Sequence, residues 1–168
     1  METVRHLGNH PTPFRGRERK RLPQVRAAVG DCQERLNFPD GHFDRVLAIH
    51  VLEHLPNLPA AVREMARVCE PGRGVLSVVI PCEGGWAYGL ARRISAQRIF
   101  ERRYQQPYRW FIEREHLNRP HEILRELERH FTVVHRAWFP LGLPSVELNL
   151  CLGLTLRPRT PAETRIAA

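Results

Sequence analysis

Apolar residues along this chain occur in short continuous runs that end at glycine, proline or aspartate. Such runs are typical of strands buried inside a sheet that is covered on both faces. In other segments the apolar residues recur every three or four positions, which is typical of helices with one buried face. We expect strands at 25–29, 43–49, 75–80, 131–139 and 147–156, and helices at 57–70, 88–103 and 120–130.

The order of these elements predicts the fold class. Strands that alternate with helices favour an α/β fold with a mostly parallel sheet. The last two strands are separated only by a turn at 141–144, which is too short for a crossover helix, so we expect them to form an antiparallel hairpin. Residues 1–24 hold three prolines, a basic run and few apolar residues, and we interpret them as a flexible basic tail before a domain at 25–168.

The charge and the cysteine content indicate which partners and which cellular compartment to expect. The formal net charge is +8, from 26 Lys and Arg against 18 Asp and Glu. An acidic partner such as nucleic acid is one interpretation of this charge, but a generally basic protein is the interpretation we favour. Four cysteines without C-x-x-C spacing, and no signal peptide, predict reduced thiols in a cytoplasmic protein. No apolar stretch has the length of a membrane span.

An ordered set of short motifs covers residues 25–83. The set begins with Gly30-Asp31-Cys32 and Leu36 to Asp40, and continues with Phe43 to Val46, Val51 to Leu55, Glu64 to Val68 and Glu70 to Gly74. In this order the motifs resemble the class I S-adenosylmethionine-dependent methyltransferases, of the type 11-like group. The resemblance implies a Rossmann-like sheet and S-adenosyl-L-methionine as the cofactor.

The resemblance also implies roles for residues at the ends of two strands. Asp31 would accept a hydrogen bond from the adenine amino group, and the backbone N–H of Cys32 would reach the adenine ring. His50 and Val51 would line the methionine side of the cofactor pocket, at the carboxyl edge where open α/β sheets bind ligands. The alternative for Asp31 is a carboxylate that caps a turn.

The methyl acceptor usually lies under the elements between the fifth and sixth strands of the family. Methyl transfer mainly requires in-line positioning, with a base where the nucleophile carries a proton. His116 is our candidate for that base, and ordinary packing is the alternative for every residue on this side. The acceptor-side candidates are Trp86, Tyr108, Trp110, Arg114 and His116.

The chain departs from the family pattern at its start. The family's first two strands, with their glycine-rich loop and ribose-binding acid, have no counterpart before residue 25. We therefore expect an exposed edge on the strand at 43–49, which could support an oligomer, and a strand at 25–29 without a neighbour. Our hypothesis is an N-terminally truncated product or a start site assigned too late, with doubtful activity of this chain alone. The upstream coding sequence tests that hypothesis.

Two other functions compete with methyl transfer to a small-molecule, sugar or lipid acceptor. His50, Glu53 and His54 form an H-x-x-E-H motif, which binds zinc in inverted zinc peptidases, with Glu122 or Glu126 as a further ligand. Pro56 and Pro59 leave almost no helix for that motif, so we expect no metal. A non-catalytic methyltransferase-like protein or basic binding module is the second alternative, based on arginines near 15–21 and 92–109.

Overall fold

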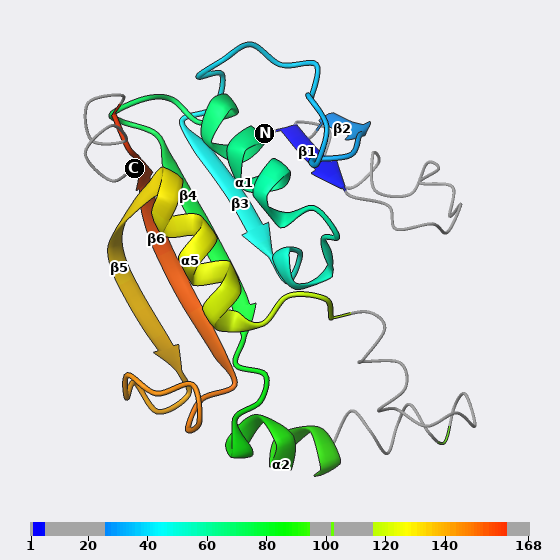
Figure 1. Ribbon diagram of the computed structural model, residues 1–168, viewed down its shortest axis with the longest axis vertical. Coiled ribbons are helices and arrows are strands. Elements are labelled where there is room, and N and C mark those ends of the chain that lie inside the picture. The colour runs from blue at the N-terminus through cyan, green and yellow to red at the C-terminus, as the bar shows by residue number, and fades with distance from the viewer. Residues whose placement is uncertain (1, 6–25, 95–101, 103–115, 161–168) are drawn as a thin grey trace.

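The computed structural model describes residues 2–5, 26–94, 102 and 116–160 (Figure 1). It is an α/β structure, as the sequence predicts, with a four-stranded sheet in the order β3-β4-β6-β5. β3 (Arg45–Ile49) and β4 (Val75–Pro81) are parallel, whereas β6 (Cys151–Pro158) is antiparallel to both β4 and β5 (Phe131–Phe139). The predicted C-terminal hairpin is confirmed.

Two helices cover one face of this sheet and bury its core. α1 (Leu58–Val68) begins where the Asn57 side chain accepts a hydrogen bond from the Ala60 N–H, and α5 (Pro120–His130) has a proline in its first turn. Both lie against the same face in Figure 1. The core formed there is closely packed and almost wholly aliphatic; its fully buried members include Leu52, Leu76, Val78, Ile80, Ile123, Leu127, Leu152 and Leu156.

The opposite face of the sheet is open in the part of the chain that the structure describes. Leu47 and Ile49 of β3 point to this face and are 49% and 56% exposed. β3 is also the end strand of the four, so one of its edges has no partner strand among the described residues. In the described part of the chain, β3 is thus the outermost strand of this sheet.

A strand that the sequence did not predict pairs with β2 (Arg26–Val29). β1 (Glu2–Arg5) is parallel to β2, with Glu2 opposite Arg26 and Arg5 opposite Val29. The expectation that the strand at 25–29 has no neighbour is therefore wrong. β1 has two charged residues in four positions and lacks an apolar run, and its pairing rests on the backbone, which every sequence supplies.

The remaining elements differ from the predictions mainly at their ends. α2 (Trp86–Ile94) begins two residues before the predicted helix, and residues 95–101 and 103 of that prediction lie outside the described residues. A single 3-10 turn, η1 (Leu52–His54), follows β3. None of the described helices has the length and apolar character needed to cross a membrane.

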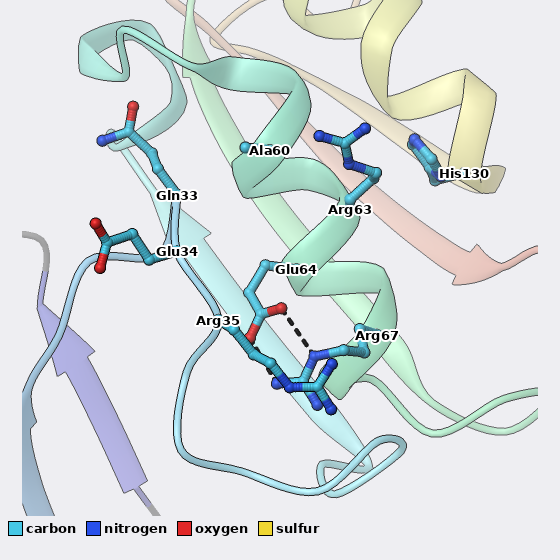
Figure 2. Close-up of a pocket in the computed structure, with 8 residues that line it drawn as sticks. All are labelled: Gln33, Glu34, Arg35, Ala60, Arg63, Glu64, Arg67 and His130. Carbon is cyan, nitrogen blue, oxygen red and sulfur yellow. Dashed lines mark hydrogen bonds and ion pairs between the residues drawn. The ribbon is translucent and has the colours of Figure 1, made fainter.

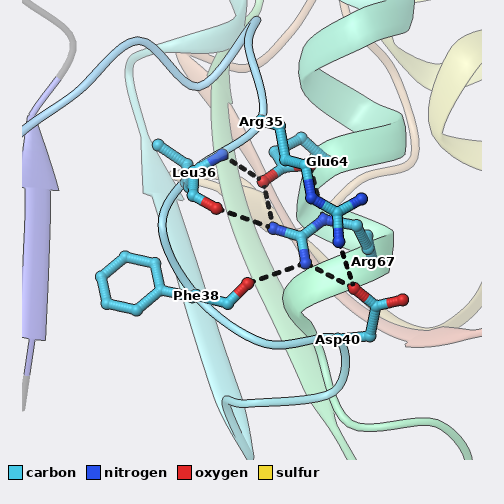
Figure 3. A network of polar contacts seen from close by, with 6 residues as sticks. All are labelled: Arg35, Leu36, Phe38, Asp40, Glu64 and Arg67. Carbon is cyan, nitrogen blue, oxygen red and sulfur yellow. Dashed lines mark hydrogen bonds and ion pairs between the residues drawn. The ribbon is translucent and has the colours of Figure 1, made fainter.

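The loop that follows β2 is fastened to α1 by one guanidinium group (Figure 3). Arg67 donates to the Leu36 and Phe38 carbonyls at 3.1 and 2.8 Å and to both carboxylate oxygens of Glu64 at 2.6 and 2.8 Å. Arg67 also binds Asp40 at 2.6 Å, and Glu64 accepts from the Leu36 N–H at 2.7 Å. These contacts fix the path of the chain between β2 and β3.

Candidate functional site

The loops after β2 and β3 and the segment before α5 meet at the carboxyl edge of the sheet. The turn after β2 reaches the loop after β3 through the Gln33 side-chain oxygen, which accepts from the Asn57 N–H at 2.6 Å. The loop after β3 in turn contacts the start of the segment before α5, because the Glu53 carbonyl accepts from the Leu117 N–H at 2.7 Å. This is the edge at which open α/β sheets bind ligands.

Asp31 lies in the turn directly after β2. Its Oδ1 accepts from the Gln33 backbone N–H at 2.9 Å, and the Gln33 side chain donates to both carboxylate oxygens at 3.1 and 3.2 Å. These contacts are those of a carboxylate that caps a turn, which is the alternative given for Asp31 in the sequence analysis. Cys32 beside it packs against the core, and burial, with the charge of Asp31, raises the pKa of its thiol to about 11.

A small hollow lies beside Asp31, between the end of β2 and the loop that Arg67 fastens. Its volume is about 240 Å³, which suits a purine ring but lies below the usual range for a whole drug-sized ligand. The hollow is lined by Val29, Gly30, Asp31, Glu34, Arg35, Leu36, Asn37 and Phe38.

A larger open hollow, of about 490 Å³, runs along the outer side of α1 toward His130 (Figure 2). Two of its charged groups, Glu64 and Arg67, are already bound to each other. It extends away from the strand ends toward the last residue of α5. The smaller hollow is therefore the better candidate for the cofactor.

His50 and Val51 follow β3 and turn the chain toward η1. His50 has a φ of 51°, in the left-handed region that non-glycine residues rarely adopt, and such strain tends to occur at functional sites. Its Nδ1 lies 3.2 Å from Oε1 of Glu53. Val51 is half-buried against the core. The two residues thus lie directly after the carboxyl end of β3, and their contact with the cofactor stays a prediction from the resemblance.

His116 contacts a carboxylate that the sequence analysis did not single out. Its Nδ1 lies 2.5 Å from Oε1 of Glu83, and both side chains are largely buried. Neither atom has a hydrogen-bond partner among the described residues, so the contact between them is a close approach of two polar atoms. The His54 ring meets the His116 ring edge to face, with centroids 4.6 Å apart. Glu83 could have been found from its position, since it follows the parallel strand β4 at the carboxyl edge.

Asn118 holds the segment that carries His116 in place. Its side-chain amide donates to the Leu52 and Leu55 carbonyls at 2.9 and 2.7 Å, next to η1. Trp86, at the start of α2, is 62% exposed and its ring is thus available to a ligand. The other acceptor-side candidates, Tyr108, Trp110 and Arg114, lie outside the described residues.

The H-x-x-E-H motif lacks the geometry of a zinc site. His50 precedes the single turn η1 that contains Glu53 and His54, so the motif has no long helix. The suggested further ligands are engaged elsewhere, Glu122 with the Arg119 N–H and Glu126 with Arg129. In the described ranges no three His, Cys, Asp or Glu residues are placed to hold a metal ion. All four cysteines are free thiols.

Comparisons with known proteins agree with this arrangement. A family model described as a methyltransferase domain matches residues 12–77. Ajmaline N-methyltransferase of Rauvolfia serpentina is 44% identical over 48 residues, which is 29% of this chain and 16% of that protein. The chain thus spans only a small part of this curated relative.

Solved methyltransferase structures share the fold. The N-methyltransferase NodS of Bradyrhizobium japonicum, in complex with S-adenosyl-L-homocysteine, superposes with a TM-score of 0.52 at 17% identity and covers 84% of this chain and 60% of its own. A possible histamine N-methyltransferase of Thermotoga maritima gives a TM-score of 0.55 at 18% identity, over 84% and 68%. The sheet order and these superpositions together define a Rossmann-like α/β fold. Residues 12–77 of this fold match the methyltransferase-domain family, and the solved structures of similar fold include S-adenosylmethionine-dependent methyltransferases.

Proposed function

We propose that this chain contributes to methyl transfer from S-adenosyl-L-methionine to a small-molecule acceptor. The contact between His116 and Glu83, at the same edge as the turn of Asp31 and Cys32, is the observation that carries the proposal. One side of the carboxyl edge then binds the cofactor, and the other side binds the methyl acceptor. The chain covers about two thirds or less of most of its structural relatives, so the activity of the whole protein belongs to this proposal.

The described residues fit the adenosyl end of the cofactor. The hollow beside Asp31 accommodates a purine ring, and an adenine amino group can replace the Gln33 side-chain amide on the Asp31 carboxylate. The backbone contact from Gln33 would still hold the turn. Val51 would close the apolar side of the pocket. When bound, the cofactor supplies a methyl group already activated by a positively charged sulfur.

On the acceptor side, His116 is the residue proposed to remove a proton. The Glu83 carboxylate beside Nδ1 orients the ring and leaves Nε2 as the nitrogen that can accept a proton from the acceptor. Burial of the pair limits competition from water. Trp86, exposed at the start of α2, would bind the apolar part of the acceptor. A sugar or lipid acceptor has no specific support among these contacts.

Two substitutions test the role of this pair. We expect His116→Asn to lower the methyl-transfer rate by roughly a factor of 10² to 10⁴, the usual contribution of a general base, and Glu83→Gln to lower it by a smaller factor. Cofactor affinity, measured by calorimetry with S-adenosyl-L-homocysteine, is expected to stay unchanged. His135→Asn on the exposed part of β5 is the matched control. Full activity of His116→Asn would contradict the proposal.

We also propose that the unpaired edge of β3 joins a second copy of the chain. If two β3 strands pair antiparallel about Leu47, Asp44 lies opposite His50 of the partner, which places groups of opposite charge together when the histidine is protonated. We expect concentration-dependent dimers in sedimentation experiments, and Leu47→Lys should weaken them. Phe139→Lys, an exposed apolar position on β5 away from this edge, is the control. A monomer at all concentrations would contradict the dimer.

A further inference from the structure

Glu53 is the most deeply buried carboxylate at the proposed site. It is 1% exposed, and its Oε2 has no hydrogen-bond partner among the described residues. Its other oxygen lies 3.2 Å from His50 Nδ1 and 3.8 Å from His54 Nε2. A buried carboxylate oxygen without a donor is costly, because the charged group has lost its water. A ligand that donates a hydrogen bond to this oxygen would offset that cost.

A second carboxylate faces the same group of imidazoles. Glu83 contacts His116, and the His116 ring touches the His54 ring, which in turn lies near Glu53. The two carboxylates therefore lie on either side of a pair of touching histidines. They come from different segments, one after β3 and one after β4, which converge at the carboxyl edge.

Neither carboxylate has an arginine partner in the described part of the chain. The other two buried glutamates each have one: Glu64 binds Arg67 at 2.6 Å and Glu126 binds Arg129 at 3.0 Å. The contrast is marked in a chain of net charge +8, where arginine is abundant. The site thus places two acidic groups beside imidazole rings and favours a cation from solution.

Resting on the proposed function, we infer that the methyl acceptor is an organic amine that binds as its ammonium form. Glu53 Oε2 accepts a hydrogen bond from the ammonium group, and Glu83 adds a second negative charge. The amine passes one N–H proton to Nε2 of His116, which releases it to solvent. The neutral nitrogen then forms the new N–C bond as the S–C bond of the cofactor breaks, so charge and atoms balance. Glu53 and Glu83 therefore set the substrate class.

Ligand titrations of the whole chain test this inference. Histidine ring resonances are followed by NMR while n-butylamine, protonated at neutral pH, or its neutral analogue n-butanol is added. We expect saturable shifts for His54 and His116 with the amine only. Glu53→Gln and Glu83→Gln should each weaken amine binding roughly tenfold, the effect of one charged hydrogen bond. Glu128→Gln, on the outer side of α5, is the matched control because it makes the same change far from the site.

The outcomes separate this inference from the proposed function. Equal shifts with n-butanol, or unchanged affinity in both glutamine variants, would overturn the ammonium site. Glu83→Gln keeps the test informative if Glu53→Gln does not fold. Binding of S-adenosyl-L-homocysteine is measured on the same sample. If S-adenosyl-L-homocysteine binds and the amine does not, the methyltransferase proposal stands and the amine inference fails. If the amine binds and S-adenosyl-L-homocysteine does not, the cation site stands and the methyltransferase proposal fails.

Discussion

At the scale of single residues, Arg67 organises more of this structure than any residue of the proposed site. Its guanidinium group joins Glu64 and Asp40 to two carbonyls of the loop after β2. The hydrogen bonds from Arg67 hold the pKa of the Glu64 and Asp40 carboxyls below their usual range. The same contacts raise the pKa of the arginine further above its already high value. The loop that lines the purine-sized hollow thus depends on one charged network.

We predict that Arg67→Met lowers the free energy of unfolding by about 3 kcal/mol, because it leaves the largely buried Glu64 carboxylate without its partner. Denaturant unfolding at neutral pH measures this effect. Arg35→Met is the control: Arg35 is exposed and binds only Asp40 among the described contacts, so its loss should cost well under about 1 kcal/mol.

The lowered pKa of Glu64 gives the same network a pH dependence. Because the folded pKa lies below the ordinary value of about 4.5, the unfolded chain binds more protons in this range. The stabilisation is therefore complete above pH 4.5 and is lost as the pH falls through the folded pKa. Arg67→Met should flatten this part of the stability profile. An unchanged acid profile in the variant would contradict the network's role.

At the scale of elements, β6 shows how one buried polar side chain moves a strand boundary. The apolar run at 147–156 predicts a strand from residue 147, but β6 begins at Cys151. Asn149 is fully buried, accepts from the Leu141 N–H and donates to the Leu143 and Ser145 carbonyls at 2.7 Å. These contacts bind residues 145–149 to the turn after β5 and remove them from the sheet.

We predict that Asn149→Ala destabilises the protein by about 2–3 kcal/mol, since the fully buried side chain makes three hydrogen bonds to the backbone that alanine cannot make. Thermal or denaturant unfolding measures the change. Asn37→Ala, an exposed asparagine in the loop after β2, should have little effect. A stability of Asn149→Ala equal to that of the starting protein would show that water replaces these contacts.

The elements that the sequence predicts are those with a periodic apolar pattern. α5 and β5 have the predicted boundaries. β3 begins two residues later than predicted, and β4 ends one residue later. β1 was missed because its four residues, two of them charged, show no apolar pattern. The contact between Glu83 and His116 was missed because it joins residues 33 positions apart, and no local pattern encodes such a separation.

At the scale of the whole molecule, the two faces of the sheet differ, because one is covered by helices and the other is open. α1 and α5 bury the core on one face, while Leu47 and Ile49 remain exposed on the other. The functional candidates lie at neither face but at the carboxyl edge, where the turns after β2, β3 and β4 converge. This arrangement agrees with the Rossmann-like methyltransferase fold shared with NodS.

The measurement that tests this account most directly is a calorimetric and NMR titration of the 168-residue protein with S-adenosyl-L-homocysteine. We predict saturable binding, with chemical-shift changes at Asp31, Cys32 and Val51, and at least tenfold weaker binding for Asp31→Ala than for the control Asp44→Ala, directly before β3. Saturable binding with shifts confined to the hollow beside Arg63 and His130, or no binding at millimolar ligand, would contradict the placement of the cofactor at the carboxyl edge.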